Sequence, residues 1–381
     1  MSASYDVIVI GAGSMGASTC WHLARMGQRV LGLDRYEVPH TFGSHHGHSR
    51  MIRMSYFEHP DYVPLLKRSY ELWGELEVGS NHQILIPTGG LYMSPPNGLI
   101  VSGCVKAARE HDLSHELLDH ETLRRQFPQF TVPEDYSGYY ESVAGVLMVK
   151  PALETFIEQT RLLGGEILGD QRVLSWRAEG DSVCVRTDTE TYHAGRLVIT
   201  SGAWAGELVC DLGLPLQVTR QTMFWIQPAE SHSNQIGLSP SWFIESAPGK
   251  GLYGFPPLPG REGMKLADHS PGKDCHAETV NRECCSEDWA AFRPLGARFL
   301  SQTLKEPLAM EACLYTSTPD GHFVLDQHPE YESVTFGAGF SGHGFKFAPV
   351  VGEILAQFAM EGETRFPVRF LSLNRFDPKC Y

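Results

Sequence analysis

The sequence predicts an α/β fold, α+β overall, in which a parallel βαβ unit is combined with a second part built on an antiparallel sheet. The chain begins with an apolar, β-branched run at 6–10, a glycine-rich turn, a helical pattern at 17–26 and a second apolar run at 29–33. Further along, short strands alternate with Pro and Gly turns through about 216–310, a pattern typical of antiparallel sheets. A length of 381 residues favours two domains.

The turn of the βαβ unit reads GAGSMG at 11–16, and its second strand ends on Asp34. Gly11 suits the tight turn, Gly13 lets a pyrophosphate approach the backbone, and Gly16 lets helix and strand pack closely. The helix that follows points its free N–H groups at the phosphates. Asp34 can accept hydrogen bonds from a ribose diol, and its charge repels a 2′-phosphate. The turn therefore predicts a dinucleotide site that disfavours NADP.

The other elements follow from periodicity and turn residues. The loop 35–49 is rich in Gly, His and Pro, which is typical of a site loop. Helices are expected at 60–76, 98–110, 121–127, 151–163 and from 348 to about 360. Strands are expected at 84–93, with a turn at Gly89 and Gly90, and at 166–169, 172–177, 183–187, 196–200, 222–227, 251–255, 264–268 and 334–338.

Segments typical of a nucleotide-binding domain come from the start, the middle and the end of the chain. Two discontinuous domains are therefore expected. The cofactor domain comprises 1–82, 150–218 and 321–381, and the substrate domain comprises 83–149 and 219–320.

Charge and cysteine content exclude several classes of partner. The formal net charge is −14 and the pI is about 5.6, which argues against binding to nucleic acid or an anionic membrane. A signal peptide and an apolar run long enough to span a membrane are not found, and the nine cysteines form no CxxC pair, so a cytoplasmic location is expected. His45, His46 and His48 lack a nearby carboxylate or thiolate, so no metal site is expected.

Six segments, in order along almost the whole chain, resemble the monomeric sarcosine oxidase family of amine-oxidising flavoenzymes, which includes N-methyltryptophan oxidase and pipecolate oxidase. The segments are 6–34, GSHHGHSRMIR at 43–53, LYGFP at 252–256, MKLADH at 264–269, CLYTSTPDGHFVLD at 313–326 and GAGFSGHGFKFAPVVGEIL at 337–355. The last two are the most specific. The resemblance implies a Rossmann-type FAD-binding domain with an interleaved substrate domain whose antiparallel sheet covers the flavin.

The resemblance also implies roles for individual residues. Cys313 matches the cysteine that joins FAD through a thioether, and Arg53 with Lys346 matches the pair that binds the substrate carboxylate. Catalytic roles fall to Lys265, where oxygen is reduced, to Arg50 at the flavin face, and to Tyr253 and His269 in the substrate pocket. The expected cofactor contacts are Gly11, Gly13, Ser14, Met15, Gly16, Asp34, Arg35, Ser44, His46, Arg50, Val173, Cys313, Gly342, Gly344 and Lys346.

Each role has a structural alternative when the residue is considered alone. Cys313 could be a buried free thiol, Lys265 an exposed strand lysine, and the arginines solvated surface groups. Tyr253, His269, Tyr56 and Glu58 could serve packing or the surface. The chain carries His48 where the family usually has Asp and Met54 where it often has His, so the electrostatics there are open.

The reaction expected from the resemblance is the oxidation of sarcosine with O2 and water to glycine, formaldehyde and H2O2, by a monomer whose partners are a small amino acid and oxygen. Pipecolate or N-methyltryptophan oxidation is the alternative within the family. An NAD-dependent dehydrogenase and a nucleotide-binding module without catalysis are alternatives from other classes, since the glycine-rich turn and Asp34 would suit both.

Overall fold

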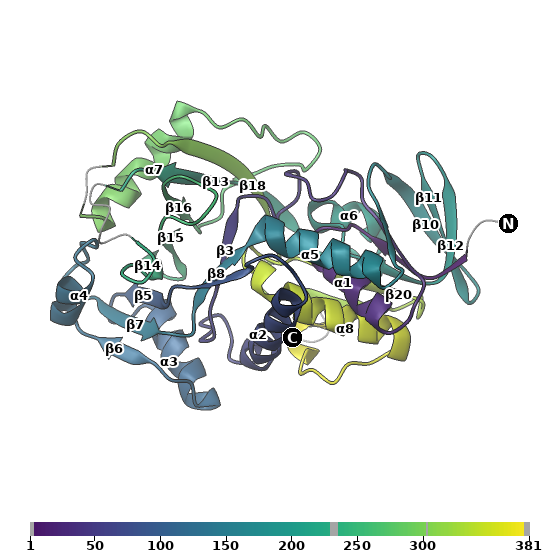
Figure 1. Ribbon diagram of the computed structural model, residues 1–381, viewed down its shortest axis with the longest axis horizontal. Helices are drawn as coiled ribbons and strands as arrows, with labels where there is room; N and C mark the ends of the chain where they lie inside the picture. Colours follow the sequence, from purple (N-terminus) through teal and green to yellow (C-terminus); the bar gives the residue numbers. More distant parts are fainter. Residues whose placement is uncertain (1–3, 229–234, 302–303, 377–381) are drawn as a thin grey trace.

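The structure is a computed structural model that describes residues 4–228, 235–301 and 304–376. Two halves lie side by side along the longest axis (Figure 1). One half contains the N-terminal helix and the long C-terminal helix, and the other contains the second large sheet. None of the described helices combines the length and the apolar character needed to cross a membrane.

The predicted βαβ unit is present at the start of the chain. It consists of β1 (Ser4–Ile10), α1 (Ser14–Arg25) and β2 (Val30–Leu33). The two strands are parallel, with Ile8 opposite Leu31. Because both faces of a central parallel sheet are covered, these apolar runs are continuous rather than alternating.

The first sheet has eight strands within the described residues, in the order β10-β11-β12-β1-β2-β9, with β20 beside β12 and β19 beside β20. Its remaining strands are β9 (Glu166–Leu168), β10 (Val173–Glu179), β11 (Ser182–Thr187), β12 (Thr191–Ile199), β19 (Val324–Gln327) and β20 (Val334–Ala338). The segments therefore come from the start, middle and end of the chain, as predicted.

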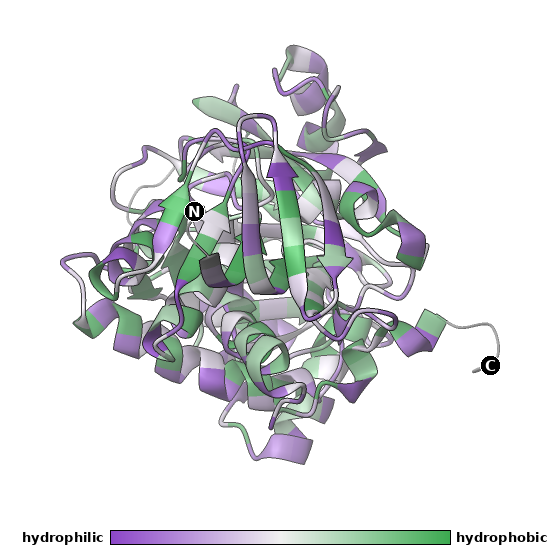
Figure 2. Cartoon of the chain, turned by 90° about the vertical axis from the view of Figure 1, so that its right-hand side faces the viewer, coloured by the Kyte–Doolittle hydropathy of each residue, from purple (hydrophilic) through white to green (hydrophobic). Residues whose placement is uncertain are grey.

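Helices cover one face of this sheet. They are α1, α5 (Val149–Leu162) and α8 (Ala348–Glu361), with α2 (Tyr62–Val78) packed against α8, and their bounds differ from the predicted ranges by at most three residues. α1 packs directly against α5 and α8. Figure 2 shows hydrophobic and hydrophilic residues on both strands and helices, and the buried apolar residues of the helices form one cluster with Val7 and Val9 of the sheet. Burial of this apolar face holds the helices on the sheet.

The second sheet has nine strands within the described residues, in the order β17-β13-β16-β15-β14-β5-β7-β6, with β18 beside β13. Its strands are β5 (Gly90–Ser94), β6 (Glu116–Leu118), β7 (Ser137–Glu141), β13 (Gln217–Ile226), β14 (Ser241–Ala247), β15 (Lys250–Phe255), β16 (Met264–Asp268), β17 (Lys273–Asp274) and β18 (Ala309–Ser317). The prediction of an antiparallel sheet needs one correction: β14 and β5 pair in parallel.

The interval 216–310 was predicted as strands and turns only, and this is wrong for α7 (Ser286–Phe299). Pro294 and Gly296 lie inside this helix and obscure its pattern in the sequence. The helix forms because Trp289 and Phe292 pack against Phe224 of the sheet. Tertiary burial therefore overrides local propensity here. The other helices of this half are α3 (Leu99–His111) and α4 (His120–Gln126).

A third sheet of three strands carries residues central to the site. It has the order β3-β8-β4, with β3 (Ser49–Ile52), β4 (Leu85–Pro87) and β8 (Gly145–Met148). Arg50 lies on β3, and Arg53 follows directly after it. The loop 43–49 and β3 thus lead from the βαβ half toward the second sheet.

Candidate active site

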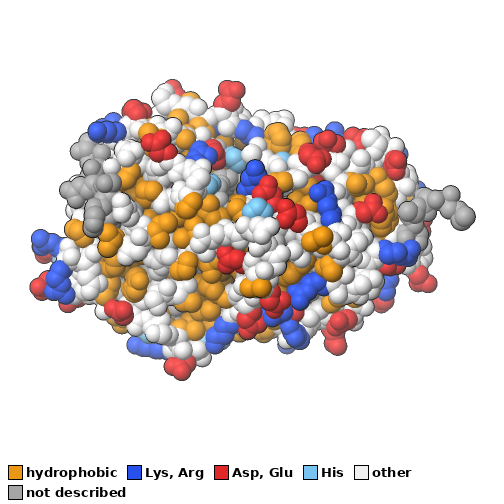
Figure 3. All heavy atoms as spheres, in the orientation of Figure 1, with side chains coloured by type: hydrophobic (Ala, Val, Ile, Leu, Met, Phe, Trp, Pro, Cys, Tyr) orange, Lys and Arg blue, Asp and Glu red, His pale blue; other side chains and the backbone are white. Residues whose placement is uncertain are grey.

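Two adjoining cavities lie where the two halves meet. The larger has a volume of about 280 Å³ and begins at the glycine-rich turn. The smaller has a volume of about 70 Å³ and is roofed by the second sheet. Arg50, Tyr315, Gly342 and Phe345 line both cavities. Figure 3 shows histidines and charged side chains gathered near the middle of one face of the molecule.

The glycine-rich turn is shaped by contacts that no side chain could share. Gly11 has φ +90°, and a Cβ on it would lie 2.7 Å from the carbonyl oxygen of Thr200. A Cβ on Gly16 would lie 1.8 Å from the carbonyl oxygen of Gly11. Gly13 precedes α1 without a side-chain cap, so the first N–H groups of the helix keep no side-chain partner there. This end of the helix suits an anionic phosphate.

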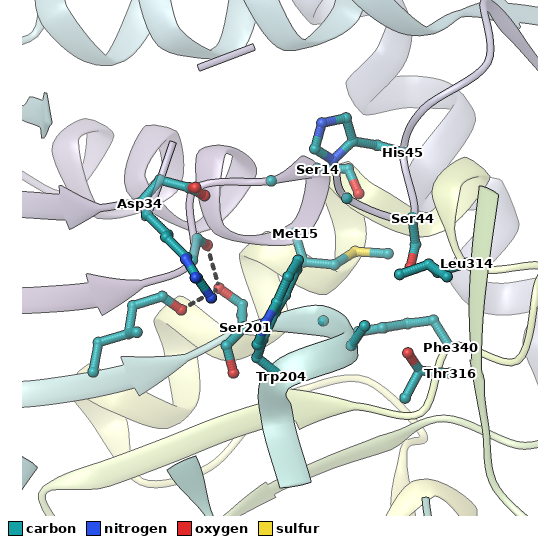
Figure 4. Close-up of a pocket in the computed structure, with 18 of the residues that line it drawn as sticks. Ser14, Met15, Asp34, Ser44, His45, Ser201, Trp204, Leu314, Thr316 and Phe340 are labelled. Carbon is teal, nitrogen blue, oxygen red and sulfur yellow. Dashed lines mark hydrogen bonds between the residues drawn. The ribbon is translucent and has the colours of Figure 1, made fainter. Parts of the chain in front are cut away.

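Asp34 is buried at the end of β2 and faces the larger cavity (Figure 4). Its carboxylate accepts hydrogen bonds from the backbone N–H of Ala12 at 2.8 Å and of Tyr36 at 3.1 Å, and His40 Nε2 lies 3.1 Å away. These bonds fix the carboxylate against the turn. Arg35, which also lines the cavity, forms an ion pair with Glu278.

Buried hydroxyl groups line the larger cavity. The hydroxyl oxygens of Ser201 and Thr316 are buried and have no hydrogen-bond partner within the described part of the chain, and both residues line this cavity (Figure 4). A Cβ on Gly342 would lie 2.4 Å from the ring of Tyr315. Buried hydroxyls without partners are uncommon unless a bound group satisfies them. These residues therefore fit a large polar cofactor such as a dinucleotide.

The structure brings most of the predicted cofactor residues to this cavity. Its lining includes Gly11, Gly13, Ser14, Met15, Asp34, Arg35, Ser44, Arg50, Val173, Gly342 and Gly344. Gly16 packs beneath the turn instead, and Cys313 and Lys346 line the smaller cavity. His46 lines neither cavity and lies 3.2 Å from Glu311 through Nε2 and Oε2.

The loop 43–49 brings Arg50 and Cys313 together. Arg50 donates through Nη2 to the carbonyl oxygen of Ser44 at 2.9 Å and also to that of His46. The Sγ atom of Cys313, on β18, lies 3.6 Å from Arg50 Nη2 and 3.4 Å from the carbonyl oxygen of Ser44. The thiol therefore lies at the junction of the two cavities, beside a fixed cation.

Lys265 is buried on β16 and does not line either cavity. Its Nζ atom donates to the carbonyl oxygens of Gly47 and Ser49, each at 2.8 Å. Burial, reinforced by repulsion from Arg50, holds the pKa of Lys265 well below its usual range. The Nζ group thus lies behind the loop that carries Arg50.

Arg53 and Lys346 line the smaller cavity, and both are buried. Nη2 of Arg53 lies 2.6 Å from both carboxylate oxygens of Glu58. Nζ of Lys346 donates to the carbonyl oxygen of His343 at 2.9 Å. Burial, together with repulsion from Arg53, lowers the pKa of Lys346 to about 7. The Arg53 guanidinium and an amine that is charged only below about pH 7 therefore face one small space.

Tyr253 and His269 also line the smaller cavity. His269 Nδ1 lies 3.2 Å from the hydroxyl of Tyr315. Burial, with repulsion from His343, lowers the pKa of His269 to about 4, so its ring is neutral near pH 7. Burial also raises the pKa of Tyr253 to about 12. Both side chains are therefore uncharged at neutral pH.

Several site residues were missed in the sequence. His45, Trp204, Thr316 and Tyr315 line the cavities, and Glu311 contacts His46. Tyr315 and Thr316 lie within the CLYTSTPDGHFVLD segment, which could have indicated them. Trp204 and Glu311 lie in segments without a motif.

Away from both cavities, on the outer strands β10 to β12, Glu179, Cys184 and His193 place potential metal-ligand atoms within 4.8 Å of one another. Arg177 on the same strands donates to Glu179 at 2.6 Å. The guanidinium group already occupies one carboxylate oxygen of this cluster.

A glycine-rich turn that opens onto one cavity, with a smaller cavity lined by two buried basic side chains beside it, suits a bound dinucleotide next to a small second ligand. The chain matches the FAD dependent oxidoreductase family, DAO, over residues 6–358, and it belongs to that family. The dinucleotide is therefore FAD, and the chain is an FAD-dependent oxidoreductase.

Several relatives align with nearly the full length of the chain. The chain is 40% identical to the monomeric sarcosine oxidase of Streptomyces avermitilis, with 100% of this chain and 98% of the relative aligned. It is 39% identical to that of Bacillus sp. strain B-0618, over 98% and 97%. It is 32% identical to the N-methyl-L-tryptophan oxidase of Salmonella dublin, over 98% and 99%.

Solved structures agree with the fold. The open form of NikD, described as an unusual amino acid oxidase essential for nikkomycin biosynthesis, superimposes with a TM-score of 0.84 over 97% of this chain and 98% of that chain, at 24% identity. Glycine oxidase from Geobacillus kaustophilus gives a TM-score of 0.78 at 20% identity, over 98% and 99%.

Proposed function

We propose that the chain is a flavin-dependent oxidase of small secondary amino acids, with sarcosine as its leading substrate. The proposed reaction converts sarcosine, O2 and water to glycine, formaldehyde and H2O2. The observation that carries the proposal is the pair of buried cations, Arg53 and Lys346, in a small cavity that adjoins the cofactor cavity. The full-length relatives named sarcosine oxidase support it.

Bound FAD would supply the redox chemistry, taking a hydride equivalent from the carbon next to the substrate nitrogen and passing the electrons to O2. The isoalloxazine ring is proposed to lie where the two cavities meet, at Arg50, Tyr315 and Gly342. Gly342 would allow close approach there, and the N-terminus of the following helical segment would favour negative charge.

The substrate carboxylate is proposed to bind to Arg53 and Lys346. Arg53 can present two N–H groups to a carboxylate, and Lys346 adds a second charge. Glu58 forms an ion pair with Nη2 of Arg53, so a substrate carboxylate would compete with this internal carboxylate. The neutral ring of His269 and the protonated Tyr253 would line the pocket without adding charge.

The amine must be neutral to release a hydride equivalent from the adjoining carbon, so turnover is expected to rise with pH. Oxygen reduction is assigned to Lys265, whose ammonium group would stabilise the developing superoxide charge. Cys313 is proposed to hold FAD by a thioether, since its thiol lies at the junction of the cavities.

Alternatives differ in the size of the substrate. A cavity of about 70 Å³ favours a compact amino acid over N-methyltryptophan, while pipecolate could use the same carboxylate contacts. Because the chain belongs to the FAD dependent oxidoreductase family, the NAD-dependent dehydrogenase alternative is rejected.

The division into a cofactor domain and a substrate domain, a monomeric state and a cytoplasmic location are also part of this proposal. Size-exclusion chromatography tests the monomeric state.

The deciding experiment is a peroxide assay with sarcosine, pipecolate, proline and N-methyltryptophan at equal concentrations. Peroxide from sarcosine, with formaldehyde in equal amount, supports the proposal. Peroxide from pipecolate or proline without formaldehyde would shift the assignment to ring oxidation. A higher kcat/KM with N-methyltryptophan would reject the compact-substrate reading.

A further inference from the structure

The second sheet turns one face toward the proposed flavin position. Two charged residues on this sheet, Lys265 and Glu311, do not belong to the carboxylate clamp, which consists of Arg53 and Lys346. In the register of the sheet, Lys265 lies opposite Trp225 of β13, and Glu311 lies opposite Met223 of the same strand. Opposite residues share a face, and so do residues two apart along a strand. Lys265, Glu311 and Cys313 therefore all lie on the face that covers the cavity.

Three basic side chains lie close together at this face: Arg261, Lys265 and Arg50. Arg261 lies over the ring of Trp225 at 3.8 Å from the centroid, and Lys265 Nζ lies 5.6 Å from the same ring. Arg50 approaches from β3, across the carbonyl oxygens of Gly47 and Ser49 that Lys265 also contacts. Cations brought this close repel one another, and burial adds a desolvation cost to each.

Glu311 is a carboxylate that contacts Arg261, one of these cations. It forms an ion pair with Arg261 and lies 3.2 Å from His46 Nε2. The charges that act on Lys265 include those of Arg50, Arg261 and Glu311, and the titratable groups of Cys313, His46 and His48 also interact with it. A thioether at Cys313 would carry no charge, so Glu311 would supply the negative charge of this group.

We propose that Glu311 is a positioning residue, whose carboxylate keeps Lys265 protonated beside Arg50 and so keeps the oxygen-reducing cation in place. The inference rests on the proposed function, because it assigns Lys265 to oxygen reduction. Glu311 acts through its charge on Lys265 and touches neither substrate nor cofactor in this scheme. Burial and repulsion from Arg50 lower the pKa of Lys265, and the negative charge of Glu311 acts in the opposite direction.

Two substitutions separate charge from structure. Glu311→Gln removes a negative charge, and Arg261→Gln removes a positive charge, and each breaks the same ion pair. If the ion pair only stabilised the local structure, both variants would shift the pKa of Lys265 in the same direction. If Glu311 acts by charge, Glu311→Gln lowers the pKa of Lys265 and Arg261→Gln raises it.

Two measurements on the flavin-loaded protein follow the proton on Lys265 between pH 5 and 10. One is the rate constant of the half-reaction with oxygen, which falls as pH rises through the pKa of Lys265. The other is the visible absorbance of the bound flavin without substrate, which responds to the loss of a nearby charge. Lys265→Met identifies the transition, because it should remove the transition from both measurements.

The expected result is a transition displaced by about one pH unit to lower pH in Glu311→Gln and to higher pH in Arg261→Gln. Displacement in one common direction, or none, overturns the inference. A transition that persists in Lys265→Met also overturns it, while peroxide formed from sarcosine by the wild-type protein leaves the proposed oxidase function intact.

Discussion

The Nη2 atom of Arg53 lies 2.6 Å from each carboxylate oxygen of Glu58, five residues further along the chain. The guanidinium group proposed to bind the substrate is thus already held by a carboxylate of its own chain. Glu58 lines the same cavity, so a substrate carboxylate would compete with it for one position.

Glu58→Gln should therefore tighten the binding of simple carboxylate ligands. A charged hydrogen bond contributes about 1.5–3 kcal/mol, so the gain in affinity should be roughly tenfold or more. Titration of the flavin absorbance with a carboxylate inhibitor measures it. Asp61→Asn removes a nearby exposed charge as the control and should leave affinity unchanged. Weaker binding in Glu58→Gln would mean that Glu58 orients Arg53 rather than competing with the ligand.

Arg53→Lys should weaken the same ligands, although it keeps the charge. Lysine lacks the planar fork of arginine, so at least one charged hydrogen bond to the carboxylate is lost. The expected loss is on the order of tenfold to a hundredfold in affinity, with a parallel loss in the half-reaction with substrate. Equal ligand affinity in wild type and variant would reject the clamp.

Carboxylate affinity should fall as pH rises through about 7, because the pKa of Lys346 is lowered to that value. Below this pH Lys346 is charged and attracts the ligand, and above it the amine is neutral. Lys346→Ala should bind more weakly at pH 6 and should lack this step in the pH profile. The exposed Lys150→Ala is the control. A step that survives in Lys346→Ala would assign the titration to another group.

Cys313→Ala should release its flavin on acid precipitation, whereas the wild-type protein should keep it. The reason is that the thiol lies at the junction of the cavities, beside Arg50. Cys184→Ala removes another buried thiol, one that lines neither cavity, and should retain acid-stable flavin. Acid-stable flavin in Cys313→Ala would move the attachment to a different residue.

The sequence was sufficient for the parts of the fold that local pattern determines. The βαβ unit follows from apolar runs and glycine spacing, which act within about thirty residues. The pairing of β14 with β5 joins segments some 150 residues apart, and no local pattern encodes it. The helix α7 contains Pro294 and Gly296, and it is stabilised by packing of Trp289 that only the folded sheet provides.

The site shows the same division. The positions of the glycine-rich turn and of Asp34 could be predicted from their spacing in the sequence, because both lie within the first βαβ unit and depend on its backbone. The ion pair of Arg53 with Glu58 depends on how their side chains are oriented in the folded protein. The contact of His46 with Glu311 joins elements far apart in the chain. The location of Lys265 behind the loop 43–49 could not be read from the MKLADH segment for the same reason.

Lys265→Met should separate the two halves of the proposed reaction. Methionine keeps most of the length of the side chain and removes the charge. The charge matters when superoxide develops, after the substrate has given up its electrons, so the half-reaction with oxygen should slow on the order of a hundredfold or more. The anaerobic half-reaction with substrate should change far less.

Stopped-flow absorbance resolves the two half-reactions, and Lys273→Met, an exposed lysine on β17, is the matched control. Methionine cannot donate to the carbonyl oxygens of Gly47 and Ser49, so the loop that carries Arg50 loses two hydrogen bonds in this variant. Equal slowing of both half-reactions would therefore indicate a displaced loop. An unchanged reaction with oxygen would transfer the role to another cation, and Arg50, which lines both cavities, is the first to test.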